Sequence, residues 1–344
     1  MPPVEISVVV PVFNAESYLT ETLDALDKQS FQAFEIILID DGSTDKSPRI
    51  LDDYCAGHER FHVLHIPNGG VYNARLAGIR QARGRYVAFC DSDDLPLPDM
   101  LEKLYAQAEN TGADITVCGF VREEMETGRV LSQEMRAFEC RGYDYPELWD
   151  VLPVVNTAVW NKLFRAELLE NVIRLEKPSR VAEDLVFSVS LYPFVRRIAF
   201  VPETLYRYRV RSRSAISHVR ANEIEQIRKN MLLTRDYALR KQDSAPMREM
   251  LDSVAFIHFG WALVIRQVKS GESSREVVSS ARQWLKREFP GYGRAGKGLG
   301  WNLCHSMLQS RVLIGRWIFC AHLMGPFLVF YDLITQKLKH EIKW

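Results

Sequence analysis

Three carboxylates stand within four residues of the chain, at Asp91, Asp93 and Asp94, directly after the apolar run at residues 86–90. The run predicts a strand, because it is short, contains aromatic side chains and is followed by two prolines. Mg²⁺ and Mn²⁺ prefer oxygen ligands and are commonly held by one or two carboxylates together with phosphate oxygens. The spacing of Asp91 and Asp93 would allow a tight turn to point both carboxylates at one ion. The run therefore predicts a site for a divalent cation that binds a diphosphate. The alternative is that one of these acids caps the next helix.

The elements around these acids alternate between strands and helices. Residues 6–14 are typical of a buried strand that ends in a turn, and residues 16–29 have the apolar spacing of a helix. A second strand at 35–39 runs into the acidic turn 40–45, and a third strand at 63–66 precedes a further helix. Together with the strand that ends at the carboxylates, this alternation predicts a mostly parallel, doubly wound sheet. Such sheets bind ligands beyond the carboxyl ends of their strands, which is where the acids lie.

Several short motifs stand along the chain in a fixed order. They are Val-Val-Pro-Val-Phe-Asn at 9–14 with Glu16, Ile-Asp-Asp-Gly-Ser-Thr-Asp at 39–45, Asn-Gly-Gly at 68–70, Ala-Arg at 74–75, Ala-Arg-Gly-Arg-Tyr-Val-Ala-Phe at 82–89, Asp-Ser-Asp-Asp at 91–94, Trp-Asn-Lys-Leu-Phe at 160–164, Glu-Asp-Leu-Val-Phe at 183–187, Leu-Tyr-Arg-Tyr at 205–208 and Ser-Ala-Ile at 214–216. This set resembles the GT-A glycosyltransferases of family two, the inverting enzymes that use nucleotide-diphosphate sugars. The resemblance covers roughly residues 4–217. One position departs from the family pattern, since Leu76 stands where the family usually has an asparagine after Ala-Arg.

The resemblance implies an α/β fold of the GT-A type, with a Rossmann-like, mostly parallel sheet flanked by helices and followed here by an α-helical C-terminal extension. It also implies a nucleotide-sugar site. Asp41 is similar to the acid that accepts a hydrogen bond from the uracil ring N–H, which implies a UDP-sugar as donor. Phe13 would offer an aromatic face to the base, with core packing as the alternative, while turn formation and capping are favoured for Asp40 and Asp45. The donor-binding residues implied are Pro11, Phe13, Glu16, Asp41, Asn68, Arg75, Asp91 and Ser92.

The resemblance assigns further roles at the phosphates. Asp93 is similar to the principal metal ligand, and Asp91 would help through a water molecule or the sugar hydroxyls. The ion, Mn²⁺ or Mg²⁺, would neutralise the departing diphosphate. Arg75 stands where family members reach the phosphates or the metal-site acids, and the alternative is a surface arginine.

Inverting transfer is a single displacement, so it requires a base for the acceptor hydroxyl and no protein nucleophile. Glu183 and Asp184 match the family's Glu-Asp pair, and the resemblance implies Asp184 as the base. The alternative is that both acids only stabilise a helix N-terminus. Trp160, Asn161 and Glu183 would bind the acceptor, with the Trp160 ring stacking on a sugar; a tryptophan buried in the core is left equally open.

Basic side chains are concentrated in two places. Four arginines alternate along a strand-like segment, and we expect them to be solvated, with contact to phosphates as the alternative; they are Arg207, Arg209, Arg211 and Arg213. From residue 265 to the end, 13 Lys and Arg stand against 5 Asp and Glu in a chain whose net charge is zero. Aromatic and basic residues mix in residues 301–344, as in helices that lie in a membrane interface. Burial in a homodimer or against the catalytic domain is the alternative.

These features predict three regions: a GT-A catalytic domain at 1–217, a helical extension at 218–298 and basic amphipathic helices at 299–344. The cysteine spacing and the N-terminus predict reduced thiols and no secretory signal. We therefore expect a transferase at the cytoplasmic face of the cell membrane, bound to anionic lipid through its tail, that passes one sugar to a saccharide acceptor linked to lipid. We expect no nucleic-acid partner. An inactive nucleotide-sugar-binding scaffold, or a transferase for a soluble or protein acceptor, remains the alternative.

Overall fold

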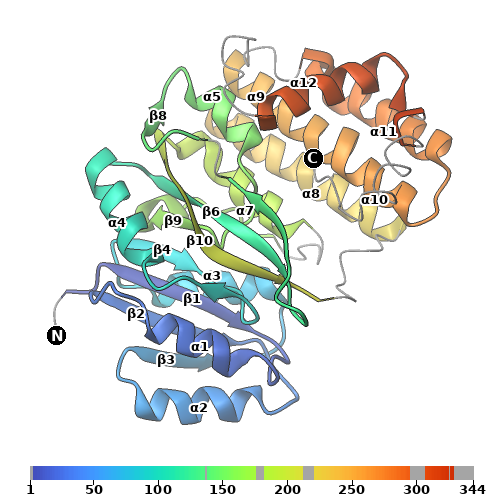
Figure 1. The fold of residues 1–344 in the computed structure, drawn as a ribbon. Helices are drawn as coiled ribbons and strands as arrows, with labels where there is room; N and C mark the ends of the chain where they lie inside the picture. Colours follow the sequence, from blue (N-terminus) through green and yellow to red (C-terminus); the bar gives the residue numbers. More distant parts are fainter. Residues whose placement is uncertain are drawn as a thin grey trace. The chain divides into compact units, whose positions relative to one another are not determined.

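The computed structural model describes residues 3–135, 138–175, 182–211, 221–294, 307–324 and 326–328. The chain forms two compact units (Figure 1). The first unit consists of Met1–Asp144 and Thr157–Ser212, and the second of Tyr145–Asn156 and Arg213–Trp344. The expected boundary between residues 217 and 218 lies outside the described residues. The short excursion at 145–156 into the second unit was not predicted.

A ten-stranded sheet forms the centre of the first unit, in the order β3-β2-β1-β4-β9-β6-β10-β5, with β7 beside β6 and β8 beside β10. Its strands are β1 (Ile6–Val12), β2 (Phe34–Asp40), β3 (Phe61–His65), β4 (Tyr86–Phe89), β5 (Leu95–Pro96), β6 (Ile115–Glu124), β7 (Val130–Glu134), β8 (Gly142–Asp144), β9 (Lys162–Arg165) and β10 (Arg197–Val210). The strands β1 to β4 are parallel to one another, and β6 is parallel to β10. The prediction of a mostly parallel α/β sheet is therefore confirmed.

Helices cover both faces of the parallel part of the sheet, which is why every residue of β1 and β2 is buried. Right-handed crossovers place α1 and α2 on one face and α3, which returns to β4 on the other side of β1, on the opposite face (Figure 1). The helices of this unit are α1 (Leu19–Asp27), α2 (Ser47–Gly57), α3 (Val71–Gln81), α4 (Met100–Thr111), α6 (Ala166–Leu169) and α7 (Glu183–Leu191). The helix α3 lies so close to β1 that a Cβ atom on Gly78 would come within 2.2 Å of Val9 Cγ1.

The strand order reverses at β1, whose neighbours are β2 and β4. The turns after these strands therefore meet at one edge of the sheet, the usual ligand-binding position in doubly wound folds. The strand β9 is antiparallel to both β4 and β6, so its first residue, Lys162, lies at this same edge. The sheet thus gathers the motif residues of β1, β2, β4 and β9 into one region.

The first helix starts later than its apolar spacing indicates, at Leu19 instead of Glu16. Residues 13–16 form a turn that hydrogen-bonds with the turn after β2, and Asn14 has a positive φ of 49°. Asparagine tolerates this left-handed conformation better than most residues do. The turn therefore takes residues that the periodicity assigns to the helix.

The second unit is helical. Its elements are α5 (Leu148–Val151), the 3₁₀ turn Leu152–Val154, α8 (Ala221–Lys241), α9 (Ala245–Ala255), a π-helical stretch (Phe256–Ala262), α10 (Leu263–Lys269), α11 (Ser274–Glu288), a second 3₁₀ turn (Pro290–Arg294) and α12 (Met307–Cys320). The continuous helix Ala245–Lys269 has the length and mean hydropathy, 1.2, of a membrane span, yet 61% of that window is buried inside the protein. A mostly buried core helix passes the same test of length and hydropathy. Residues 295–306, 325 and 329–344 lie outside the described residues.

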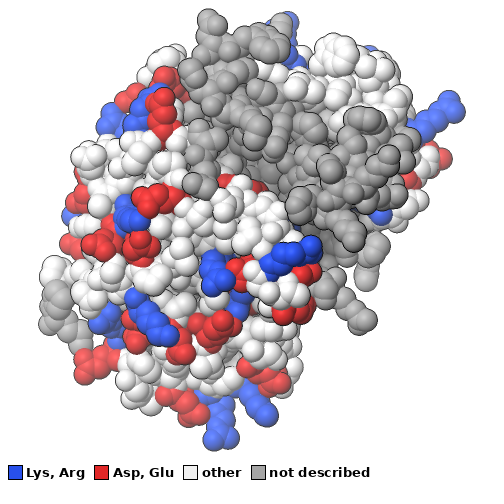
Figure 2. All heavy atoms as spheres, in the orientation of Figure 1, with Lys and Arg blue, Asp and Glu red and all other residues white. Residues whose placement is uncertain are grey.

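Charged side chains of both signs are interspersed on the visible face of the sheet-containing unit (Figure 2). No extended area of a single sign is seen among the described residues on that face. The five cysteines that the structure describes are all free thiols.

Candidate functional site

The first turn of the site, after β1, presents an aromatic ring to solvent. Phe13 is 51% exposed, so the structure does not place it in the core. Two hydrogen bonds fix this turn: Asn14 N–H donates to Ser43 Oγ at 3.0 Å, and Ala15 N–H donates to Ser47 Oγ at 2.8 Å. Pro11 is buried in β1 itself. A rigid turn that exposes a large aromatic ring is suited to stacking against a flat ligand.

Glu16 and Asp45 connect the first turn to the second. The Glu16 carboxylate accepts a hydrogen bond from Lys46 N–H at 2.9 Å, and Glu16 N–H donates to Asp45 Oδ2 at 3.0 Å. Although burial opposes the shift, hydrogen bonds from Ser47 and Glu16 lower the pKa of Asp45. The structure thus gives Glu16, like Asp45, a role in holding the two turns together.

Asp41 supports the turn that leads into α3. Its two carboxylate oxygens accept hydrogen bonds from Gly69 N–H and Gly70 N–H, at 2.7 and 2.8 Å, and its carbonyl oxygen accepts one from Asn68 Nδ2 at 2.8 Å. Gly70 has a φ of 83°, which glycine adopts without strain. Each carboxylate oxygen has two lone pairs, so Asp41 keeps acceptor capacity beyond these bonds.

The acidic turn after β4 is clamped by β10 and α1. The buried Asp94 carboxylate accepts hydrogen bonds from the Tyr206 hydroxyl at 2.9 Å and from Arg209 N–H at 2.8 Å. Asp91 N–H donates to the Tyr206 hydroxyl oxygen at 3.2 Å, and Thr22 Oγ1 donates to the Ser92 carbonyl at 3.0 Å. Asp94 therefore positions the turn and does not cap the next helix. Burial raises the pKa of the Asp94 carboxyl well above its ordinary value.

Arg75 lies at the centre of the site and is only 2% exposed. Its Nη2 donates to Asp91 Oδ1 at 3.1 Å, and its Nη1 donates to Asp184 Oδ1. Although burial opposes the charged form, Asp184 and Asp91 raise the pKa of the guanidinium. One buried guanidinium thus joins the acid after β4 to the acid at the start of α7, and the alternative of a surface arginine does not apply.

Three titratable groups around Arg75 have displaced pKa values. Loss of hydration raises the pKa of Asp91 to about 6 and that of Glu183 to about 8, and the neighbouring Asp184 adds to both shifts. Burial lowers the pKa of Lys162 to about 7, and Asp184 opposes that shift. Near neutral pH, Glu183 is therefore mostly protonated and Lys162 is close to its midpoint. Strongly displaced pKa values of this kind cluster at functional sites.

Asp93 points its carboxylate toward the end of β10, where Arg211 Nη2 donates to its Oδ2. Arg209 is buried and donates from Nε to the Asp93 carbonyl and from Nη1 to Glu21. Arg207 pairs with Glu123, its Nε lying 2.8 Å from Glu123 Oε2. The expectation that these arginines are simply solvated is therefore wrong for the three that the structure describes; Arg213 lies outside the described residues.

The pair Asp91 and Asp93 suits an open cation site. Both carboxylates are partly exposed and follow a parallel strand, but the described residues contain no group of three or more His, Cys, Asp or Glu that could hold a metal ion by itself. Mg²⁺ is commonly bound by one or two carboxylates plus phosphate oxygens, with water completing its shell. The donor set fits an ion whose remaining ligands come from a bound diphosphate.

Trp160 and Asn161 are placed differently from the expected acceptor contacts. Trp160 is 5% exposed, and its ring stacks on Tyr206 and Tyr208 with centroids 4.7 and 5.1 Å away. Asn161 is fully buried, donates to the Cys118 carbonyl at 2.8 Å and accepts from Lys162 Nζ at 2.9 Å. The alternative of a core tryptophan therefore applies, because tyrosines already occupy a face of the indole.

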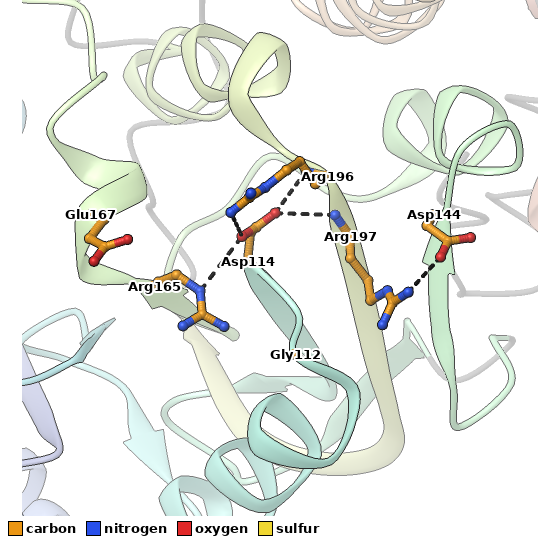
Figure 3. Close-up of a pocket in the computed structure, with 7 residues that line it drawn as sticks. All are labelled: Gly112, Asp114, Asp144, Arg165, Glu167, Arg196 and Arg197. Atoms are coloured by element: carbon orange, nitrogen blue, oxygen red, sulfur yellow. Dashed lines mark hydrogen bonds and ion pairs between the residues drawn. The ribbon is translucent and has the colours of Figure 1, made fainter.

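A separate polar cavity of about 380 Å³ lies at the opposite edge of the sheet (Figure 3). Asp114 and Arg197, which line it, stand at the amino ends of β6 and β10. The Asp114 carboxylate accepts from Arg196 N–H at 2.7 Å, and Arg197 Nη2 lies 2.6 Å from Asp144 Oδ2. The lining carries three arginines and three acids, so its charges balance. This cavity is distinct from the edge that carries the motif residues.

The clamp formed by Tyr206, Asp94 and Arg209 was not predicted, although Tyr206 and Asp94 lie within the matching motifs. Nothing local indicates that a tyrosine more than a hundred residues away reaches the acidic turn.

Comparison with known proteins agrees with this geometry. The sequence model of the family described as Glycosyl transferase family 2 matches residues 7–173. The uncharacterized glycosyltransferase EpsJ of Bacillus subtilis is 34% identical over 210 residues, which are 59% of this chain and 60% of that protein. The glycosyltransferase GlyG of Streptococcus pneumoniae is 32% identical over 224 residues, which are 61% of this chain and 72% of that protein.

TarS of Staphylococcus aureus is related in both sequence and structure. It is named a poly(ribitol-phosphate) beta-N-acetylglucosaminyltransferase and is 28% identical over 211 residues, 59% of this chain and 35% of that protein. The crystal structure of TarS 1–349 with UDP-GlcNAc superposes with a TM-score of 0.69 at 20% identity, covering 98% of this chain and 93% of that one. This likeness shows a common GT-A fold. With the family match and the GlyG relationship, it follows that the chain belongs to glycosyltransferase family 2.

Proposed function

We propose that this protein transfers a single sugar from a UDP-sugar to a hydroxyl group of a saccharide acceptor, with inversion at the anomeric carbon. The observation that carries the proposal is the Arg75 bridge. It holds Asp91, on the donor side, and Asp184, the expected base, in one hydrogen-bonded unit. One buried cation lies between the two acids and bonds to both. This arrangement fits a reaction in which one acid helps to bind the donor and the other accepts the proton of the acceptor hydroxyl.

The uridine diphosphate would lie along the turns after β1, β2 and β4. The exposed Phe13 ring offers a stacking face for the base, and Asp41 and Asn68 lie in the adjacent turns. TarS, whose fold this chain shares, has been crystallised with UDP-GlcNAc, which favours a uridine nucleotide. Mn²⁺ or Mg²⁺ held by Asp93 and Asp91 would supply charge neutralisation for the departing UDP.

Asp184 is assigned as the general base. Its side chain is 25% exposed, so an acceptor hydroxyl can approach it, and Arg75 fixes its orientation. In the proposed step the hydroxyl oxygen attacks the anomeric carbon while its proton passes to Asp184, and UDP leaves from the opposite face. Glu183, mostly protonated near neutral pH, adds little negative charge beside the base.

The acceptor is proposed to be a growing saccharide linked to lipid at the cytoplasmic face of the membrane. TarS acts, by its name, on poly(ribitol phosphate), which favours a polymeric acceptor. In the second unit, α12 exposes Ile314 and Trp317, and Leu323 follows just beyond it; Trp317 is 63% exposed. An exposed tryptophan beside basic residues suits a membrane interface. A homodimer that covers these side chains is the competing explanation.

The proposal is tested with a panel of UDP-sugars, with Mn²⁺ or Mg²⁺ and with chelator, comparing the intact protein with Asp93→Ala and Asp184→Asn. Metal-dependent release of UDP from one donor, lost in both variants, is the expected result and names the sugar. Asp53→Asn is the matched control, because Asp53 is exposed and, in the part of the chain that the structure describes, pairs with Arg49 at 3.5 Å. Donor binding without turnover in the presence of varied saccharide acceptors would instead favour an inactive scaffold.

A further inference from the structure

Arg211 holds the carboxylate that the proposed function assigns to the cation. Its Nη2 donates to Asp93 Oδ2, and its guanidinium carbon lies over the Tyr18 ring, 5.0 Å from the centroid. Arg211 is about half exposed and Asp93 is partly buried. The guanidinium therefore sits on one oxygen of Asp93 with an aromatic ring beneath it.

The contact follows from how β10 meets the acidic turn. Arg209 binds Asp94 through its backbone N–H and the Asp93 carbonyl through Nε. Successive side chains of an extended chain alternate in direction, so Arg211, two residues further on, emerges on the same side as Arg209. The strand end is thus anchored on the turn, which brings Arg211, the first residue after β10, close to Asp93.

Each acid of the proposed cation pair is matched by an arginine, Asp91 by Arg75 and Asp93 by Arg211. The two arginines differ in freedom, because Arg75 is buried while Arg211 reaches solvent. A divalent ion that binds alone at the Asp93 oxygen on which Arg211 sits displaces that guanidinium and deprives it of its carboxylate partner. A diphosphate provides a new partner, since its oxygens suit the planar fork of arginine.

We propose that Arg211 occupies the cation's place on Asp93 and moves to the diphosphate when the nucleotide arrives, which makes cation and nucleotide binding mutually dependent. The inference rests on the proposed function, because it takes the ligand to be a nucleotide diphosphate with a divalent ion. By linkage, the factor by which UDP raises Mn²⁺ affinity equals the factor by which Mn²⁺ raises UDP affinity.

The test measures Mn²⁺ binding to the full chain by electron paramagnetic resonance of the free ion, with and without UDP, in wild type and Arg211→Ala. Without UDP, the variant should bind Mn²⁺ about threefold to fivefold more tightly, the range that the loss of one partly exposed ion pair allows. The enhancement by UDP should shrink in the variant, because the released guanidinium no longer meets the diphosphate. Arg207→Ala is the matched control, since Arg207 lies near the end of β10, four residues before Arg211, but pairs with Glu123.

The outcomes distinguish the proposed exchange from a simple phosphate contact of Arg211. If Arg211→Ala binds Mn²⁺ alone no more tightly than wild type while losing UDP affinity, Arg211 is only a phosphate contact and the exchange is refuted, with the proposed function intact. If wild type does not bind Mn²⁺ even with UDP, the metal part of the proposed function fails and the exchange fails with it. Thermal unfolding of both variants checks that the fold is retained.

Discussion

At the scale of single residues, Arg75 is the group on which the geometry of the site depends. Replacing it with alanine would leave Asp91 and Asp184 without their shared cation inside a poorly hydrated region. Removing one partner of a buried ion pair costs about 3–5 kcal/mol, so we expect a marked fall in the free energy of unfolding. Transfer activity should fall by about a hundredfold or more, since misplacing a catalytic group by 1 Å has that cost.

The conservative variant separates charge from geometry. Lysine keeps a positive charge but lacks the planar fork, so Arg75→Lys should recover part of the stability and little of the activity. Urea unfolding and initial transfer rates measure the two effects. Arg80→Lys, at an exposed position of the same helix, is the control, and equal losses in both variants would contradict this assignment.

Glu183 predicts a pH dependence of stability. Burial and Asp184 raise its pKa from 4.5 to about 8 in the folded protein. Between these values the folded state keeps a proton that the unfolded state has released, so this group lowers the free energy of unfolding as pH rises. Glutamine cannot release a proton, so the stability of Glu183→Gln relative to wild type should increase from pH 5 to pH 8.

Urea unfolding at several pH values provides this measurement. The same exchange at Glu203, which is more than half exposed and pairs with Lys103, is the surface control. A flat difference for Glu183→Gln would show that its carboxyl is already ionised in the folded protein.

The sequence predicted the identities of the acids better than their partners. Asp91, Asp93 and Asp184 could be found because each follows or begins a strand or helix that its apolar pattern predicts. Their pairing with Arg75 and Arg211 depends on helix and strand positions that no local pattern contains. The role of Trp160 could not be predicted in this way. An aromatic residue in a motif can bind a ligand or pack in the core, and only the packing in the structure distinguishes the two.

At the scale of elements, β10 is the strand that fixes the acidic turn. Tyr206→Phe removes the hydroxyl that binds Asp94 and Asp91, leaving a buried carboxyl with one partner fewer. An unsatisfied buried group costs about 1–3 kcal/mol, and we expect that loss together with weaker UDP binding. Tyr208→Phe is the control, because Tyr208 also stacks on Trp160 but its hydroxyl has no partner among the described residues.

Calorimetric titration of UDP and urea unfolding compare the two variants. Equal effects of Tyr206→Phe and Tyr208→Phe would mean that ring packing, and not the hydroxyl bond, holds the turn.

The contact of α3 with β1 gives a second prediction for an element. Gly78→Ala would place Cβ 2.2 Å from Val9 Cγ1, so α3 must move away from the strand and carry Arg75 with it. Overpacking of this kind costs about 1–3 kcal/mol. Val9→Ala in the same protein should restore part of the loss by removing the methyl groups.

Gly57 is the matched position for this experiment. A Cβ atom there meets nothing within 4 Å, and Gly57 ends a helix, so Gly57→Ala should leave stability equal or slightly increased. Thermal unfolding distinguishes the two positions, and a neutral Gly78→Ala would show that α3 has room to shift.

Element types were largely predictable, because apolar periodicity and turn residues mark the strands and helices of the parallel half. The antiparallel β9 was not, since a four-residue segment with two apolar residues carries no information about its direction. The start of α1 was placed too early because hydrogen bonds with a distant turn outweigh helical spacing in residues 16–18.

At the scale of the whole molecule, the exposed side chains of the second unit lead to a test of membrane attachment. Replacing Ile314 and Trp317 with serine should reduce flotation of the full chain with anionic vesicles, because less apolar surface can enter the interface. The control is Leu233→Ser in α8, which is 44% exposed and lies outside residues 301–344. Unchanged flotation, with a loss of dimer in sedimentation, would favour the competing explanation.

The division into units was only partly predictable. Composition and the end of the matching motifs indicate a helical region after the sheet, as observed. The assignment of 145–156 to the second unit depends on the packing of α5 and the turn after it against α9, which is about a hundred residues away. Short helical turns carry too few apolar positions to reveal their partner.

The reversed strand β9 also bears on how the chain acquires its structure during synthesis. In the described sheet, β9 lies between β4 and β6. The strand β6 therefore cannot join the parallel strands until residue 165 has left the ribosome. Until then the outer edge of β4 has unpaired backbone groups, which other chains could pair with. The acidic turn gains Tyr206, Arg209 and Arg211 later still, so a nascent chain contains the acids of this turn well before it can order them.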